Sequence, residues 1–158
     1  MQLNLDPATD LSFTRSLDVP RQLVWRCWTE PQHIPHFFIP APHKVTAVDI
    51  DPRPGGRFNT TIEVEGNIIE NRGVYLDVVP EMLLVFTDAY TEGWKPAPDP
   101  FMTAILLLAD RADGGTDYTA VARHRDAAAC ERHKQMGFYE GWGIVATQLE
   151  SYAKSLAG

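Results

Sequence analysis

Five histidines are the side chains of this sequence best suited to bind a metal ion or to move a proton near neutral pH. His33 and His36 are three residues apart, His43 follows shortly after, and His124 and His133 flank the start of an expected helix. One hypothesis gathers His33, His36 and His124 into a metal site. The alternative is solvated histidines in loops and at helix ends. Because no cysteine or carboxylate cluster accompanies the spacing, we favour the alternative and predict no metal and no cofactor.

His124 has a second interpretation because it ends an expected strand just before the last helix. Strand alternation places it on one face with Tyr118, Ala120 and Ala122. It would then anchor a ligand carbonyl or carboxylate, or act as an acid or base. The alternative, which we favour, is a strand-end histidine that bonds loop backbone.

Other signatures of catalysis are weak. The sequence has no GxSxG nucleophile elbow and no glycine-rich loop that opens a helix. Cys27 falls on an apolar helix face, where we expect it to be buried. Cys130 is expected near a helix N-terminus, which would lower its pKa. We predict no catalytic residue, and an enzyme is the less favoured class.

The N-terminal elements that must position these residues are a strand and two short helices. Residues 11–19 alternate as a strand does, apart from Arg15. Pro20 suits the first turn of a helix. Thr29 is expected to cap a second short helix, with Pro31 in its first turn.

The middle of the chain reads as six strands. Two strand-like runs lie within 44–66 and are separated by the turn at Pro52–Gly56. Four more runs, joined by short turns, cover residues 68–79, 82–90, 100–109 and 116–124. With the first strand this gives about seven, and sequential hairpins indicate a largely antiparallel sheet.

The C-terminal segment has helical periodicity from Asp126, its expected N-cap, nearly to the end of the chain. One apolar stripe consists of Phe138, Trp142, Val145, Leu149, Tyr152 and Leu156. Gly137 lies inside the expected helix just before it, where packing or a bend would explain a glycine. Extended backwards, the stripe reaches Gln135 and Glu131, which are polar. We therefore expect the first half of one long helix to face a wetter space.

Composition limits the functional classes. The chain has 158 residues, a hydrophobic fraction of 44%, two cysteines and a net charge of −7. So acidic a surface repels phosphate, which argues against nucleic-acid and membrane partners. With no signal peptide or apolar spanning run visible, we expect a cytoplasmic location.

Four segments carry a resemblance to a known superfamily. They are residues 17–40, 51–58 (DPRPGGRF), 73–87 (GVYLDVVPEMLLVFT) and 137–152 (GFYEGWGIVATQLESY). From about residue 11 to 156 the chain resembles the SRPBCC superfamily, the START-like helix-grip fold. It is most similar to the bacterial stand-alone branch that resembles the C-terminal domain of the activator of the ninety-kilodalton heat shock protein ATPase.

The resemblance implies an α+β, helix-grip fold. A curved antiparallel sheet of about seven strands, in the order strand, two helices, six strands, helix, would wrap around the long C-terminal helix. Residues 1–158 would form one START-like domain, with residues 1–10 loosely held.

The superfamily includes lipid carriers, receptors, cyclases and co-chaperone domains, so the fold leaves several functions open. We expect a cavity between sheet and helix that binds a small, largely hydrophobic molecule. One alternative is a co-chaperone that contacts a heat-shock ATPase, and a third is a cyclase- or hydrolase-like enzyme. The convex sheet face would also suit a homodimer.

The expected cavity residues are mostly aromatic. Trp94 stands out because it lies in a polar, proline-rich loop that the resemblance places near the cavity entrance. Phe58, Phe86 and Trp142 are assigned to the core. The ligand-binding candidates are Phe37, Phe38, Tyr75, Trp94, Phe101, His124, Glu131, Gln135, Phe138 and Tyr139.

Overall fold

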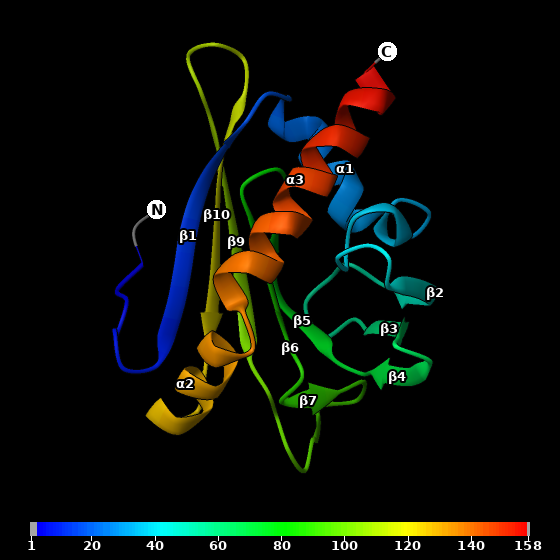
Figure 1. Cartoon of the computed structure of the whole chain (residues 1–158), viewed down its shortest axis with the longest axis vertical. Coiled ribbons are helices and arrows are strands. Elements are labelled where there is room, and N and C mark those ends of the chain that lie inside the picture. Colours follow the sequence, from blue (N-terminus) through cyan, green and yellow to red (C-terminus); the bar gives the residue numbers. More distant parts are fainter. Residues whose placement is uncertain (1–2, 158) are drawn as a thin grey trace.

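The computed structural model describes residues 3–157, which form two antiparallel sheets, a short hairpin and three α-helices (Figure 1). The elements are β1 (Asp10–Leu17), α1 (Arg21–Thr29), the 3-10 turn η1 (Ile34–His36), β2 (Lys44–Ile50), β3 (Phe58–Val64), β4 (Asn67–Asn71), β5 (Val74–Val79), β6 (Leu83–Thr87), β7 (Tyr90–Thr91), β8 (Lys95–Pro96), β9 (Thr103–Asp110), β10 (Thr116–Arg123), α2 (Ala127–Gln135) and α3 (Phe138–Ala157). The α+β class, the curved antiparallel sheet and the long C-terminal helix are confirmed.

The large sheet has the order β1-β10-β9-β6-β5, and its register aligns one row of apolar side chains on the face toward α1 and α3. The row runs from Phe13 through Ala120, Leu106 and Leu84 to Val78; the middle three are buried in the main core, and the two end residues are partly buried and pack against it. Because alternate residues of a strand share a face, this register fixes which side chains meet the helices.

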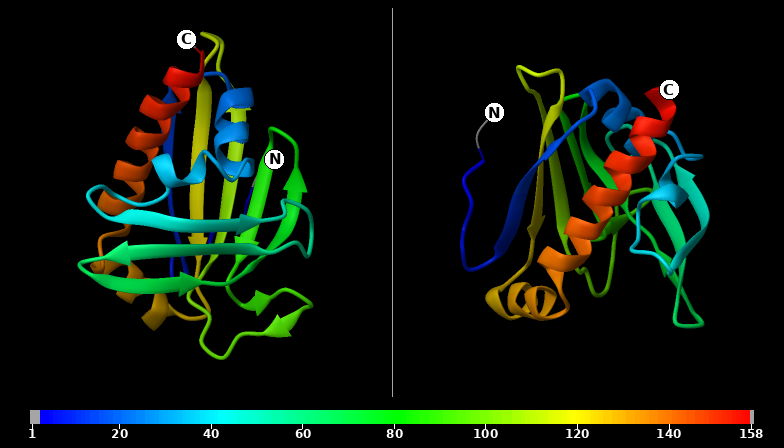
Figure 2. Two further views of the ribbon diagram at one scale, coloured as in Figure 1. Left: turned by 90° about the vertical axis from the view of Figure 1, so that its right-hand side faces the viewer. Right: turned by 45° about the horizontal axis from the view of Figure 1, so that its top comes forward.

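The run at 68–79, expected to be one strand, is two. β4 joins β2 and β3 in a three-stranded sheet, whereas β5 is the edge of the large sheet. The break needs Gly73, since a Cβ there would lie 2.4 Å from the backbone oxygen of Thr87. As Figure 2 shows, the strands of the small sheet run across those of the large sheet.

The second predicted helix is only the turn η1, so the expectation that Thr29 caps it is wrong. Thr29 is instead the last residue of α1, and its hydroxyl donates a 2.7 Å hydrogen bond to the carbonyl of Trp25. Side chains that bond the backbone four residues earlier are compatible with a helix end.

The C-terminal helix is interrupted at Gly137, so the prediction of one continuous helix is wrong. Gly137 has a φ of +96°, which breaks the helix between α2 and α3. The predicted N-cap is confirmed, because the Asp126 carboxylate accepts a 2.8 Å bond from the amide of Ala129. In α3 the predicted stripe is also confirmed, with Phe138 and Leu149 buried against the sheet.

The N-terminal segment contacts the sheet between residues 3 and 9. Leu3 packs against a cluster on the convex face. The carbonyl of Asn4 accepts a bond from Arg123, and the carbonyl of Thr9 accepts one from the amide of His124. These contacts attach the segment along the end of β10.

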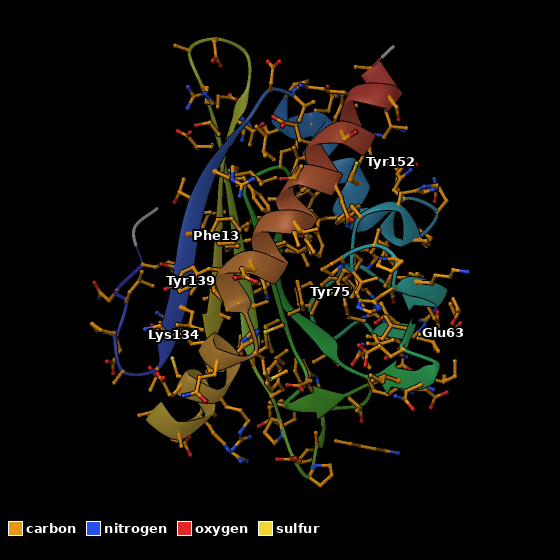
Figure 3. All side chains as sticks on the ribbon, viewed as in Figure 1. Phe13, Glu63, Tyr75, Lys134, Tyr139 and Tyr152 are labelled. Carbon is orange, nitrogen blue, oxygen red and sulfur yellow. The ribbon has the colours of Figure 1, made fainter. Side chains whose placement is uncertain are left out.

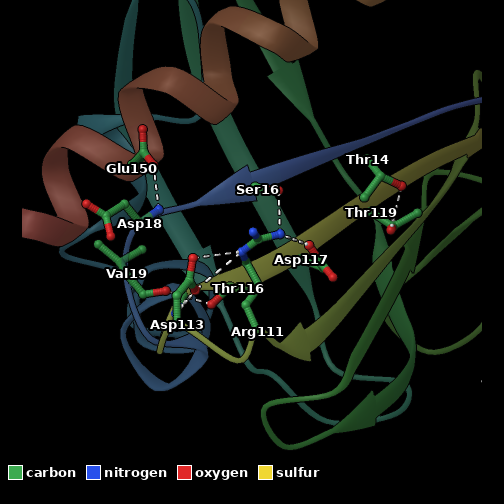
Figure 4. A network of polar contacts seen from close by, with 11 residues as sticks. Thr14, Ser16, Asp18, Val19, Arg111, Asp113, Thr116, Asp117, Thr119 and Glu150 are labelled. Carbon is green, nitrogen blue, oxygen red and sulfur yellow. Dashed lines mark hydrogen bonds and ion pairs between the residues drawn. The ribbon is translucent and has the colours of Figure 1, made fainter.

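The opposite end of the sheet is closed by a polar network (Figure 4). Arg111 donates to the Ser16 hydroxyl at 2.7 Å and to the Asp117 carboxylate at 2.8 Å. The Thr116 hydroxyl donates to the carbonyl of Val19 at 2.7 Å. These bonds connect the β9–β10 turn and the start of β10 to the end of β1 and to Val19.

Candidate functional site: an aromatic cavity at the helix junction

A cavity of about 500 Å³ lies between the large sheet, the small sheet and the α2–α3 junction. This volume is typical of small-molecule sites. Its walls are mostly apolar and are formed by Trp28, Phe38, Ile39, Pro40, Phe58, Ile62, Asn71, Arg72, Gly73, Phe86, Thr87, Asp88, Phe101, Met102, His133, Met136, Gly137, Phe138, Gly141, Trp142 and Val145.

One wall is a group of packed rings. Phe58 and Phe86 are stacked, with centroids 4.4 Å apart, and Phe38 lies 5.8 Å from Phe58. Trp28 lies 5.9 Å from Phe86. Phe58 and Phe86 therefore belong to the core, as predicted, and also line the cavity with the ring surface that the core leaves uncovered.

Two polar residues of the wall are held by neighbouring strands. The Asp88 carboxylate accepts bonds from the backbone amides of Phe101 and Met102 at 2.8–3.0 Å. The Thr87 hydroxyl bonds that of Thr103 at 2.9 Å. These contacts fix an acceptor-rich group, Asp88, at the end of the cavity next to Phe101.

The lining also carries an amide and a cation at the end of β4. The Asn71 amide donates to the Thr60 hydroxyl at 3.2 Å. The Arg72 guanidinium lies 3.3 Å from the Glu70 carboxylate, and half of its side chain is exposed. Its charge is therefore partly balanced and screened by solvent.

The cavity end formed by α2 contains a histidine pair. His133 Nδ1 lies 2.8 Å from His124 Nε2, and His124 Nδ1 lies 2.8 Å from the Thr9 carbonyl oxygen. Both imidazoles are buried, and His133 lies against the rings of Phe101 and Phe138, at centroid distances of 4.6 and 5.2 Å.

Burial sets the protonation of this wall. Desolvation, together with the neighbouring His124, lowers the pKa of His133 to about 4. The imidazole of His133 is therefore neutral at physiological pH and is not a cationic anchor for a carboxylate ligand.

Comparison with known proteins places this architecture in a family. Residues 18–154 match the family model described as Activator of Hsp90 ATPase homolog 1-like protein. The chain belongs to this family. No curated protein matches the sequence of this AHSA1-like chain.

Solved structures of other bacterial proteins share the fold. A protein from Nitrosomonas europaea is 40% identical with a TM-score of 0.93, and the match covers 97% of this chain and 99% of that one. A protein from Mycobacterium smegmatis is 26% identical, with a TM-score of 0.76 and coverage of 91% and 90%. An AHSA1-like protein from Aeromonas hydrophila has the same fold at 14% identity, with a TM-score of 0.70 and 94% of each chain covered. Among residues 3–157 no helix is long and apolar enough to cross a membrane.

Five of the aromatic candidates lie at or directly behind the cavity wall of this AHSA1-like chain. Phe38, Phe101 and Phe138 line it. Phe37 and Tyr75 are fully buried behind the lining residues, and Figure 3 shows Tyr75 between β5 and α3. The structure thus brings together rings from the segment after η1, the large sheet and α3.

The other candidates do not line the cavity. Trp94 and Tyr139 are exposed by 52% and 50%, and Figure 3 shows Tyr139 at the start of α3. Glu131 and Gln135 are exposed and bond each other at 3.2 Å. The polar continuation of the α3 stripe is directed to solvent because the chain turns between α2 and α3. His124 is connected to the cavity through His133.

The histidines of the metal hypothesis are not brought together. His33 bonds the Tyr152 hydroxyl at 2.7 Å and the Glu30 carboxylate at 3.0 Å, and His36 stacks on Tyr152. His124 bonds Thr9 and His133 instead. In the described part of the chain no group of three or more metal-ligating side chains is found.

Both cysteines are buried, which agrees with the expectation for Cys27 and overturns the one for Cys130. Burial raises the pKa of the Cys27 thiol to about 11. Burial also raises the pKa of Cys130, and the nearby carboxylates of Asp10 and Glu131 act in the same direction.

Sequence reasoning missed Trp28, Asp88, His133 and Met136 as lining residues. For His133 a signal was available, because glycine just after a periodic segment marks a helix end. With a stop at Gly137, the separate helix has Ala129, Cys130 and His133 at spacings of one and three, which is one buried face.

Proposed function

We propose that this AHSA1-like protein binds a small, largely apolar molecule in the cavity at the α2–α3 junction. The observation that carries the proposal is the cavity of about 500 Å³, walled by aromatic and aliphatic side chains. Burying about 250 Å² of apolar ligand surface contributes roughly 6 kcal/mol before the entropy of association is subtracted. Micromolar affinity is consistent with that balance.

Gly141 offers a direct way to fill the cavity. It lies on α3 and lines the cavity, and a Cβ added there would meet no described atom within 4 Å. Gly141→Leu would project a side chain into the space, while Gly141→Ala would add only a methyl group. Both changes favour the helix by roughly 1 kcal/mol. The two variants therefore differ mainly in how much of the cavity the new side chain fills.

Native mass spectrometry of protein purified from its own host tests the proposal. We expect a small molecule that is lost on denaturation, retained by the wild type and Gly141→Ala and at least about tenfold depleted in Gly141→Leu. Equal retention by the two variants would place the molecule elsewhere and refute a ligand role for this cavity.

The family description supports a second candidate, a co-chaperone that acts on a heat-shock ATPase. Such an activity would use the protein surface, so Gly141→Leu and Gly141→Ala should stimulate the purified ATPase equally. Absence of a complex and of any rate change with the wild type would remove this candidate.

A further inference from the structure

The histidine pair determines which hydrogen-bonding group the cavity presents to a ligand. A carbonyl oxygen only accepts hydrogen bonds, so the 2.8 Å contact with Thr9 requires a proton on His124 Nδ1. With both imidazoles taken as neutral, His124 Nε2 is an acceptor, and His133 Nδ1 donates to it across their 2.8 Å contact.

The same rule determines which nitrogen of His133 carries its proton. With the proton of neutral His133 on Nδ1, its Nε2 carries a lone pair. Nε2 makes no hydrogen bond to residues 3–157. Two side-chain atoms of these residues are both enclosed and unpartnered, Trp28 Nε1 and the Tyr75 hydroxyl oxygen, and Nε2 is not one of them, so it is accessible. His133 lines the cavity, and we infer that this accessible nitrogen is the hydrogen-bond acceptor that the residue offers to a ligand.

The surroundings of His133 reinforce this polarity. Its ring lies 4.6 Å from Phe101, and the backbone amide of Phe101 is held by the Asp88 carboxylate at 2.8 Å. Two acceptors, one of them anionic, therefore stand at the same end of the cavity. The cation of the lining, Arg72, directly precedes Gly73, which packs against Thr87 and Asp88, and it is already paired with the Glu70 carboxylate.

We propose that the ligand is a hydrophobic alcohol or phenol whose hydroxyl donates a hydrogen bond to His133 Nε2. This inference rests on the proposed function and adds the polar end of the ligand. A carboxylate at that position would meet a lone pair and the charge of Asp88, while Arg72, the cation of the lining, is already paired with Glu70. The cavity therefore discriminates hydroxylated molecules from acids of the same shape.

Three naphthalene probes test the inference by fluorescence titration at about pH 7.5: 2-naphthol, 2-methoxynaphthalene and 2-naphthoate. The wild type should bind 2-naphthol about tenfold more tightly than the ether, as expected for one hydrogen bond, and more tightly still than the acid. In His133→Asn the amide nitrogen replaces Nδ1 as donor to His124 but nothing replaces Nε2. The preference should fall to within about twofold.

Each result has one meaning. Equal binding of the three probes by the wild type, or tightest binding of 2-naphthoate, overturns the inference and leaves the apolar cavity as a ligand site. Binding of none overturns the proposed function as well. Nitrogen NMR of the wild type gives an independent reading that needs no variant: a proton on His133 Nε2 in place of Nδ1 would refute the assignment.

Discussion

The buried His133 should make the stability of this protein depend on pH between about 6.5 and 4. In the unfolded chain a histidine takes up a proton near pH 6.5, whereas in the folded protein the pKa of His133 is about 4. Between these values the unfolded state binds more protons than the folded state. The free energy of unfolding must therefore fall as the pH falls through this window.

The size of the change in the free energy of unfolding follows from the shift in the pKa of His133. The difference between about 6.5 and about 4 corresponds to roughly 3 kcal/mol at its limit, since one pKa unit is about 1.4 kcal/mol. Between about pH 7.5 and 4.5 the wild type should lose roughly 2–3 kcal/mol through this side chain. Above about pH 7 the contribution is constant, because His133 is neutral in both states.

Urea denaturation at several pH values, followed by tryptophan fluorescence, measures this dependence. His133→Asn is the matched control, since it keeps a donor for His124 but does not titrate. Between the two pH values the free energy of unfolding of the wild type should fall by about 2 kcal/mol more than that of the variant. The carboxylates and the other histidines titrate in both proteins, so the comparison isolates His133. Parallel pH profiles would refute the conclusion that His133 is buried in its neutral form.

Three further predictions concern other buried positions. Tyr75→Phe removes a buried hydroxyl that has no partner among the described residues, and should raise the free energy of unfolding by about 1 kcal/mol in urea; a clear loss would reveal a missing partner. Gly137→Ala places a side chain at a φ of +96° and should lower the melting temperature at a cost of about 1–2 kcal/mol, whereas Gly141→Ala should not lower it. The Cys27 thiol, with its pKa raised to about 11, should react with a disulfide reagent only after denaturation, and rapid labelling of the native protein would contradict its burial.

Much of the fold could be predicted because local patterns and tertiary packing agree. Alternation in 116–124 and helical spacing from Phe138 onward are both satisfied by the same core, so β10 and α3 appear where expected. Asp126 functions as a cap because capping depends on the next three residues alone. A second helix was predicted where only the turn η1 forms. Thr29 does not cap it, because its hydroxyl bonds the carbonyl of Trp25 within α1.

The cavity could be predicted only in part. Phe38, Phe101 and Phe138, which line the cavity, could be recognised because the resemblance places the elements that carry them near the concave side of the sheet. Glu131 and Gln135 were placed there by extending a helical stripe through Gly137. That extension assumed a continuous helix, and the positive φ at Gly137 ends it. Because the helix ends at Gly137, Glu131 and Gln135 face solvent and His133 lines the cavity in their place.

The sequence alone determined the α+β class, the buried faces of β10 and of α3, and the resemblance to the family. Tertiary structure alone decided that β4 leaves the large sheet and that His124 meets His133. These depend on contacts between residues far apart in the chain, such as Thr9 with His124 and Gly73 with Thr87. The direction of a hydrogen bond depends on both of its partners. The chemistry of the cavity therefore emerges only when the folded chain brings them within bonding distance.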